Sequence, residues 1–356
     1  MKRSRFTYNF HYAVNWKKPR LTLRIMQAYA NLLLLGRQPM RSIDVNIGLA
    51  CNLRCTHCFA ENLKIKGGAP LANEEWRDVF QQAIDLGTIS IAFTGGEPMI
   101  SPRLFELIPL AQPERMLVIL ATNATMLSPD LAARLKDAGV DLLQISIDSG
   151  IAEEHDRFRG RDGAFAATMR AIDVARAAGL KVAASPTVSH LNIDSPGFRR
   201  IIDWARRERI LVNLSLAVPV GEWAGHDECL LTPEDMERVN ELVRTTPHVR
   251  RDFETNYWTQ GCGAATEKLY VSPFGDVLAC PYMHISFGNV RHERLADIRG
   301  RMLQNAFLKD FHPRCLTAED REFIDNYLPR EFLQDRPLPR AEAVFANLPQ
   351  PRPAGH

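Results

Sequence analysis

Apolar residues follow two different spacings between residues 41 and 216, and the two spacings alternate along the chain. Short runs rich in Ile, Val and Leu are separated by longer segments in which apolar residues recur every three or four positions. The short runs predict strands at 43–47, 89–93, 116–121, 142–147, 180–186 and 211–216. The longer segments predict helices at 73–86, 102–110, 129–138, 164–178 and 198–206.

This alternation predicts an α/β fold with a parallel sheet, because only parallel neighbours need a helical crossover between consecutive strands. The strands are short and rich in Ile, Val and Leu, as expected when both faces of a sheet are covered. Periodicity does not distinguish an open sheet from a partial barrel. In either form, ligands bind at the carboxyl ends of the strands.

The flanking segments have other patterns. Residues 21–35 predict an amphipathic helix that ends at Gly36. Its basic start allows a helix on a membrane surface, but packing against the rest of the protein is the interpretation we favour. After residue 219, the pattern predicts a helix at 233–243 and a β-hairpin from 268–271 and 277–279. Many prolines follow residue 328, which predicts a loosely ordered end.

Composition excludes several classes of protein. The chain has 356 residues and a net charge of +2, so its total charge gives no reason to expect nucleic acid or an anionic membrane as a partner. No run of about 18 apolar residues predicts a transmembrane segment, and no secretory signal is recognisable. We therefore expect a cytoplasmic protein. No glycine-rich nucleotide loop follows any predicted strand.

Cysteine is the residue type that points to chemistry. Three of the seven cysteines lie within eight residues, Cys229 stands alone as a buried apolar side chain, and the rest lie near the C-terminus: Cys262, Cys280 and Cys315. In a reducing compartment, such grouping indicates metal or redox chemistry more than disulfides.

Cys51, Cys55 and Cys58 directly follow the first predicted strand. Three thiolates at this spacing can hold three corners of a [4Fe–4S] cluster and leave one iron open for chemistry. The alternative is a structural zinc site with His57 as its fourth ligand. Zinc sites usually pair one C-x2-C with a second pair further on, and none follows here.

The C-x3-C-x2-C spacing resembles the signature of the radical S-adenosylmethionine (AdoMet) superfamily, with His57 at the position that is usually aromatic. The resemblance implies a partial (β/α)6 barrel with a small C-terminal α+β domain. Together with the flanking patterns, it leads us to expect an N-terminal helical extension at 1–40, the barrel at 41–218, the auxiliary domain at 219–328 and a proline-rich tail at 329–356. It also implies two cofactors, AdoMet and a [4Fe–4S] cluster.

Motifs at the other strand ends resemble the same family. Gly95, Gly96 and Glu97 follow the second strand, as in the family's GGEP motif, which binds the amino group of AdoMet. Asn123 follows the third strand in a TNA sequence where the family often has TNG. The resemblance also places His57, in the cysteine loop, at the implied cofactor site.

The fourth strand and the segment after it complete the implied AdoMet site. Similar family members use a serine at this strand end and an arginine before a glycine near the cofactor carboxylate, which here correspond to Ser146 and Arg159. A guanidinium suits a carboxylate because it donates two parallel hydrogen bonds. The alternative is that this charged run forms a solvated salt-bridge cluster.

Cys262, Cys280 and Cys315 surround the predicted hairpin and resemble the C-terminal extensions called SPASM or twitch domains, the shorter twitch type fitting better. The resemblance implies an auxiliary [4Fe–4S] cluster held by these three cysteines. Its fourth iron position would bind substrate, a side chain such as His284 or His312, or nothing. The alternative is that all three are ordinary buried thiols.

The resemblance implies reductive cleavage of AdoMet to a 5′-deoxyadenosyl radical, with flavodoxin or ferredoxin as the electron donor. We favour a small-molecule substrate, such as a sugar, nucleoside or cofactor precursor, because about 40 residues before the first strand are too few for an independent peptide-recognition domain. Modification of a ribosomally made peptide is the first alternative. A metal-binding module without enzymatic activity is the second.

Overall fold

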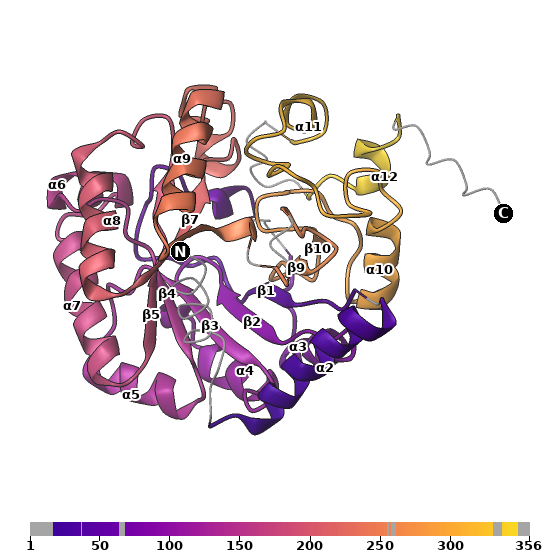
Figure 1. The fold of residues 1–356 in the computed structure, drawn as a ribbon. Helices are drawn as coiled ribbons and strands as arrows, with labels where there is room; N and C mark the ends of the chain where they lie inside the picture. The colour runs from indigo at the N-terminus through magenta and orange to yellow at the C-terminus, as the bar shows by residue number, and fades with distance from the viewer. Residues whose placement is uncertain are drawn as a thin grey trace.

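The computed structural model describes residues 17–36, 38–63, 68–254, 256–257, 261–329 and 337–347. One ten-stranded sheet organises them, in the order β10-β9-β1-β2-β3-β4-β5-β7-β6, with β8 also paired to β7 (Figure 1). The strands are β1 (Ser42–Asn46), β2 (Ser90–Thr94), β3 (Leu117–Thr122), β4 (Leu142–Ile145), β5 (Lys181–Ala184), β6 (Thr187–Val188), β7 (Leu211–Leu216), β8 (Val249–Arg251), β9 (Lys268–Val271) and β10 (Val277–Leu278).

The sheet curls into a partial barrel whose convex side is covered by helices (Figure 1). The helices are α2 (Pro19–Leu35), α3 (Asn73–Asp85), α4 (Leu104–Leu110), α5 (Pro129–Asp137), α6 (Ala152–Arg159), α7 (Ala164–Ala177), α8 (Pro196–Glu208), α9 (Pro233–Thr245), α10 (Leu295–Met302), α11 (Arg321–Asn326) and α12 (Ala341–Val344). None of the helices in the described part of the chain is long and apolar enough to cross a membrane.

Alternation along β1 shows how the barrel acquires two different faces. Ile43 and Val45 are fully buried in the hydrophobic core that also includes Trp76 of α3. Ser42 and Asp44, between and beside them, line the cavity inside the barrel. Successive side chains of a strand point to opposite faces, so the outer face supplies stability while the inner face is available for polar chemistry.

All six strands predicted for the barrel are present, within two residues of the expected ends. The parallel pairing of β1 to β5 and of β5 to β7 confirms the predicted sheet. Among the described helices and strands, six were not predicted: β6, β8, α6, α10, α11 and α12. The two strands have only two and three residues, too few to show a periodicity. The sequence of α6 is strongly charged and has few apolar residues, so it lacks the apolar spacing by which a helix is predicted.

The predicted C-terminal hairpin is present as β9 and β10, which pair antiparallel. The sequence did not reveal that β9 also pairs parallel with β1, with Ser42 opposite Lys268. The hairpin therefore extends the barrel sheet instead of standing apart from it. A division between residues 218 and 219 stays a proposal about sequence organisation, since one sheet runs across it.

Part of the proline-rich tail packs on the protein. The Ser286 N–H donates to the carbonyl of Pro339 at 2.9 Å, and the Ala341 N–H donates to the carbonyl of Ser286 at 2.9 Å. Phe345, just after α12, lies with its ring centroid 5.5 Å from that of Tyr327. The end of the tail lies outside the described residues.

Helix α2 lies across the amino ends of the barrel strands. Lys18, immediately before it, is buried and forms an ion pair with Asp141, the residue before β4. The Lys18 ammonium also donates to the carbonyl of Gly139 at 3.0 Å, and Asp141 Oδ2 accepts from the Val118 N–H at 2.8 Å. This pair joins the helix to two strands at once.

We predict that Lys18→Met lowers the free energy of unfolding by about 1–3 kcal/mol, because it removes a buried ammonium that pairs with Asp141 and donates to the carbonyl of Gly139. Chemical denaturation followed by circular dichroism measures the loss. Glu208→Gln is the matched control, because its pair with Arg176 is nearly half exposed and should contribute under about 1 kcal/mol. Equal losses in the two variants would contradict the anchoring role of Lys18.

Candidate active site

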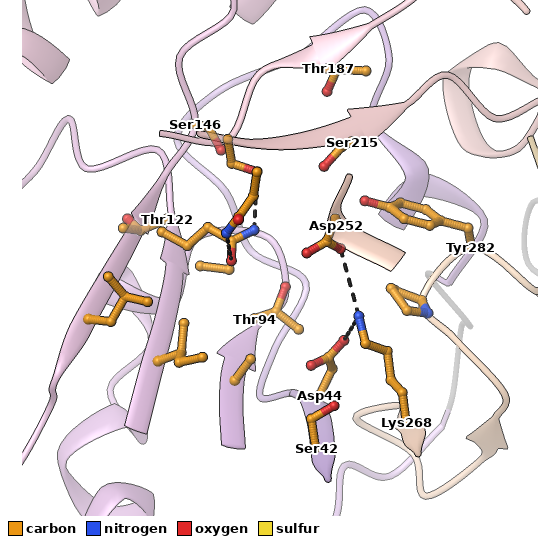
Figure 2. Close-up of a pocket in the computed structure, with 18 of the residues that line it drawn as sticks. Ser42, Asp44, Thr94, Thr122, Ser146, Thr187, Ser215, Asp252, Lys268 and Tyr282 are labelled. Carbon is orange, nitrogen blue, oxygen red and sulfur yellow. Dashed lines mark hydrogen bonds and ion pairs between the residues drawn. The ribbon is translucent and has the colours of Figure 1, made fainter. Parts of the chain in front are cut away.

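A cavity of about 540 Å³ runs through the inside of the barrel. Its lining at the carboxyl ends of the strands includes nearly all the residues predicted for the cofactor site: Cys51, Cys55, His57, Cys58, Gly95, Gly96, Asn123, Ser146 and Arg159. The opposite wall is polar, with Asp44, Asp252, Lys268 and Tyr282 (Figure 2). The structure thus brings the strand-end motifs together around one chamber.

The loop that carries the first three cysteines is held by backbone contacts to the loop after β2. The Gly96 N–H donates to the carbonyl of Gly48 at 2.9 Å, and the Glu97 N–H donates to the carbonyl of Ala50 at 2.8 Å. A Cβ at Gly95 or Gly96 would lie only 2.2 or 2.3 Å from those same carbonyl oxygens. Both glycines therefore permit an approach that no other residue allows.

The end of α6 holds the middle of the cysteine loop. The Thr56 N–H donates to the carbonyl of Phe158 at 3.1 Å. Gly160 follows with a φ of +64°, and a Cβ there would lie 2.1 Å from the carbonyl oxygen of Arg54. The charged segment after β4 shows little periodicity in sequence. It nevertheless packs closely against the cysteine loop, and the contacts are made by backbone atoms.

The short 3₁₀ helix η3 (Gly221–Trp223) holds the last cysteine. The Glu222 N–H donates to the carbonyl of Cys58 at 3.0 Å. A Cβ at Gly221, whose φ is +64°, would lie 2.0 Å from that oxygen. Segments that follow β2, β4 and β7 therefore fix the shape of one loop.

The three thiols of this loop are free and differ in exposure, with Cys51 the most exposed. Burial raises the pKa of the Cys51 thiol, and it raises the pKa of Cys58 to about 11. A thiolate is therefore costly here unless a metal supplies positive charge, as iron does in a cluster. Cysteine sulfur is also the donor that iron–sulfur clusters use.

The imidazole of His57 lies among aromatic rings. Its centroid is 4.1 Å from that of Phe158, with the rings nearly parallel, and 5.6 Å from that of Trp223. Burial lowers the pKa of His57 to about 3, so the ring is neutral. Among the described residues, no group of three His, Cys, Asp or Glu side chains is arranged around a single ion. An iron–sulfur cluster does not need all its ligands around one ion, because it spreads them over several irons.

Arg159 is fixed beside the first cysteine set by Asp148, a residue that the sequence left unassigned. Its Nε and one terminal nitrogen each lie 2.6 Å from Asp148 Oδ2, and the other terminal nitrogen lies 3.6 Å from Cys55 Sγ. Burial opposes the charge of Arg159, but Asp148 and Cys55 outweigh it and raise the pKa of the guanidinium. Arg159 is therefore a cation that is held in place beside Cys55 of the cysteine loop.

Glu97 is buried and does not line the cavity. Its carboxylate accepts hydrogen bonds from Thr122 Oγ1 at 2.6 Å, from the Asn123 N–H at 2.8 Å and from the Met99 N–H at 3.0 Å. The structure thus shows Glu97 joining the ends of β2 and β3. Its expected contact with an amino group stays a prediction. Ala124 has a φ of +59°, the left-handed conformation for which glycine is the usual residue.

The second cysteine set lines a smaller cavity of about 50 Å³ next to the first. Burial raises the pKa of Cys280 to about 12 and also raises the pKa of Cys262 and of Cys315. The two histidines considered as further ligands are not among the residues that line this cavity: His284 Nε2 is 3.2 Å from the Pro281 carbonyl, and His312 Nδ1 is 2.9 Å from that of Arg314. Three convergent soft donors fit an iron–sulfur cluster here as well.

Comparison with known proteins decides the family. A profile for the radical SAM superfamily matches residues 45–205, and one for the SPASM iron–sulfur cluster-binding domain matches residues 262–318. The AdoMet-dependent heme synthase of Nitratidesulfovibrio vulgaris is 30% identical over 293 residues, which cover 74% of this chain and 79% of that protein. The chain belongs to the radical SAM superfamily.

Other similarities support the same assignment. The PqqA peptide cyclase of Granulibacter bethesdensis is 27% identical over 316 residues, 80% of this chain and 83% of that protein. The solved structure of anSMEcpe with bound AdoMet has a TM-score of 0.58 at 17% identity and covers 84% of this chain and 92% of that one. It confirms the predicted partial-barrel fold.

The family assignment also confirms the predicted class of activity and the cofactors. This radical SAM protein is an enzyme, and it uses AdoMet with a [4Fe–4S] cluster. Its SPASM domain carries auxiliary iron–sulfur chemistry, as the C-terminal cysteines led us to expect. A metal-binding module without enzymatic activity is therefore excluded.

We predict that Gly160→Ala reduces iron bound at the first cysteine set, because the new methyl group would collide with the Arg54 carbonyl and displace the loop. Gly163→Ala is the matched control: Gly163 has a φ of +76°, but a Cβ added there would meet no atom within 4 Å. That control should lose only the left-handed penalty of about 1–2 kcal/mol. Equal iron content in the two variants would show that the close contact at Arg54 is unnecessary.

Proposed function

We propose that this radical SAM enzyme modifies a small cofactor precursor inside the barrel cavity. The observation that carries the proposal is the cavity itself: one chamber extends from the first cysteine set to a polar wall beside the second. When bound, AdoMet and the reduced cluster supply a 5′-deoxyadenosyl radical that takes a hydrogen atom from the substrate.

Cys51, Cys55 and Cys58 are the proposed ligands of the catalytic cluster. All three line the chamber, and the backbone contacts described above fix the loop between them. Arg159 donates toward Cys55 Sγ, and hydrogen bonds to ligand sulfur are one means by which a protein tunes a cluster. The proposed ligands of the auxiliary cluster are Cys262, Cys280 and Cys315.

The remaining predicted residues surround the first loop and form the proposed AdoMet site: His57, Gly95, Gly96, Glu97, Asn123, Ser146 and Arg159. Ser146 points its hydroxyl into the chamber (Figure 2). Arg159 is already held by Asp148, so it can receive a carboxylate without losing further conformational freedom. The two glycines leave backbone exposed to the ligand.

The chamber walls suit a polar small molecule. Hydroxyl groups project inward from several strands, and Lys268 with Asp44 and Asp252 forms a charged region opposite the cofactor end (Figure 2). A cavity of this volume lies in the range that small-molecule sites occupy. The similarity to a heme synthase makes iron porphyrins the first class of precursor to test.

Modification of a ribosomally made peptide is the second candidate. The similarity to a peptide cyclase favours it, and that similarity extends over more of the chain than the similarity to the heme synthase. A single side chain of a peptide would then enter the same chamber.

Iron analysis after anaerobic reconstitution tests the two ligand sets. We expect about eight irons per chain in the wild type and about four after either Cys51/Cys55/Cys58→Ala or Cys262/Cys280/Cys315→Ala. Cleavage of AdoMet to 5′-deoxyadenosine should disappear only in the first variant. About four irons in the wild type, unchanged by the second set of substitutions, would rule out the auxiliary cluster.

Stimulation of 5′-deoxyadenosine formation tests the substrate class, with reduced flavodoxin or ferredoxin as the proposed electron donor. Iron porphyrins with carboxylate side chains should raise the rate above the uncoupled background and be changed in mass themselves. A peptide encoded beside the enzyme should not. The reverse result would replace the small-molecule proposal with the peptide alternative.

A further inference from the structure

Lys268 stands in the wall that the two cavities share. It is the first residue of β9, and it lines both the large chamber and the small cavity of the second cysteine set. Its Nζ lies 3.9 Å from Asp44 Oδ2 and 3.7 Å from Asp252 Oδ2, so its side chain projects between two carboxylates (Figure 2). These carboxylates come from distant parts of the sequence.

The ammonium of Lys268 forms ion pairs with two carboxylates among the described residues. Distances of 3.7 and 3.9 Å exceed the 2.7–3.2 Å of an N–H···O hydrogen bond. An ammonium at these distances acts on both carboxylates through its charge.

The charge of Lys268 is permanent at neutral pH. Burial opposes ionisation, but Asp252 and Asp44 outweigh it and raise the pKa of the ammonium. Lys268 also lines the small cavity together with Cys262, Cys280 and Cys315. A fixed cation thus faces the second cysteine set from the substrate side.

We propose that Lys268 raises the reduction potential of the auxiliary cluster and that Asp44 and Asp252 limit this effect. Reduction adds one negative charge to a cluster, and a cation in a low-dielectric wall stabilises that charge. A higher potential makes the cluster a better acceptor for one electron from the chamber. The inference rests on the proposed ligands of the auxiliary cluster.

The test is a redox titration of the auxiliary cluster, followed by electron paramagnetic resonance. Full-length protein with Cys51/Cys55/Cys58→Ala isolates the signal of the second site. Lys268→Met should lower the midpoint potential by an amount that corresponds to at least a tenfold change in the reduction equilibrium, about 59 mV for one electron. Lys268→Arg keeps the charge and should keep the potential within experimental error.

Replacing either carboxylate should change the midpoint potential in the opposite direction. Asp252→Asn removes a negative charge from the same wall and should raise the midpoint potential. Lys181→Met is the matched control, because Lys181 is a half-buried lysine of β5 that does not line the small cavity. It should leave the potential unchanged. If Lys268→Met fails to retain iron, Asp252→Asn and Asp44→Asn carry the test.

The experiment distinguishes failure of the proposed role of Lys268 from failure of the proposed cluster ligands. An unchanged potential in Lys268→Met with full iron content, or a lowered potential in Asp252→Asn, would overturn the role of Lys268 and leave the proposed function intact. Absence of any auxiliary signal in the parent protein would overturn the proposed ligands, and the role of Lys268 with them.

Discussion

The structure of the active site depends on close backbone packing around the loop of Cys51, Cys55 and Cys58. Carbonyl groups of this loop accept hydrogen bonds from the segments after β2 and β7, and the Thr56 N–H donates to the end of α6. Glycines at 96, 160 and 221 make the approach possible, since a Cβ at any of them would overlap a loop carbonyl. These backbone contacts to the barrel thereby fix the positions of the three cysteines.

A second constraint, the pairing of β9 with β1, explains why the cavities of the two cysteine sets adjoin. β9 pairs with β1, the strand that leads into the first cysteine loop, and so brings the C-terminal hairpin into the barrel sheet. The side chain of Lys268 then reaches Asp44 on the inner face of β1. The cavities of the two cysteine sets consequently share one wall, and the chamber in which we propose the substrate binds extends to it.

Sequence periodicity was sufficient for the barrel because its strands are apolar and separated by amphipathic helices. The cysteine sets were recognisable because their spacing is local. Pairing of β9 with β1 was not predictable from periodicity, since Lys268 and Ser42 are far apart in sequence and neither has an unusual neighbour pattern. The same limit applies to Asp148, whose contact with Arg159 depends on where α6 ends. The close approach of Gly221 to the Cys58 carbonyl was not predictable either, because Gly221 belongs to no motif at a strand end.

Our central claim is that each cysteine set holds a cluster and that the proposed AdoMet site lies at the first of them. Electron paramagnetic resonance of the reduced wild-type enzyme, recorded before and after addition of AdoMet, tests it most directly. We predict two overlapping [4Fe–4S] signals, of which AdoMet changes one. A spectrum in which AdoMet changes neither signal, or changes both, would contradict the claim.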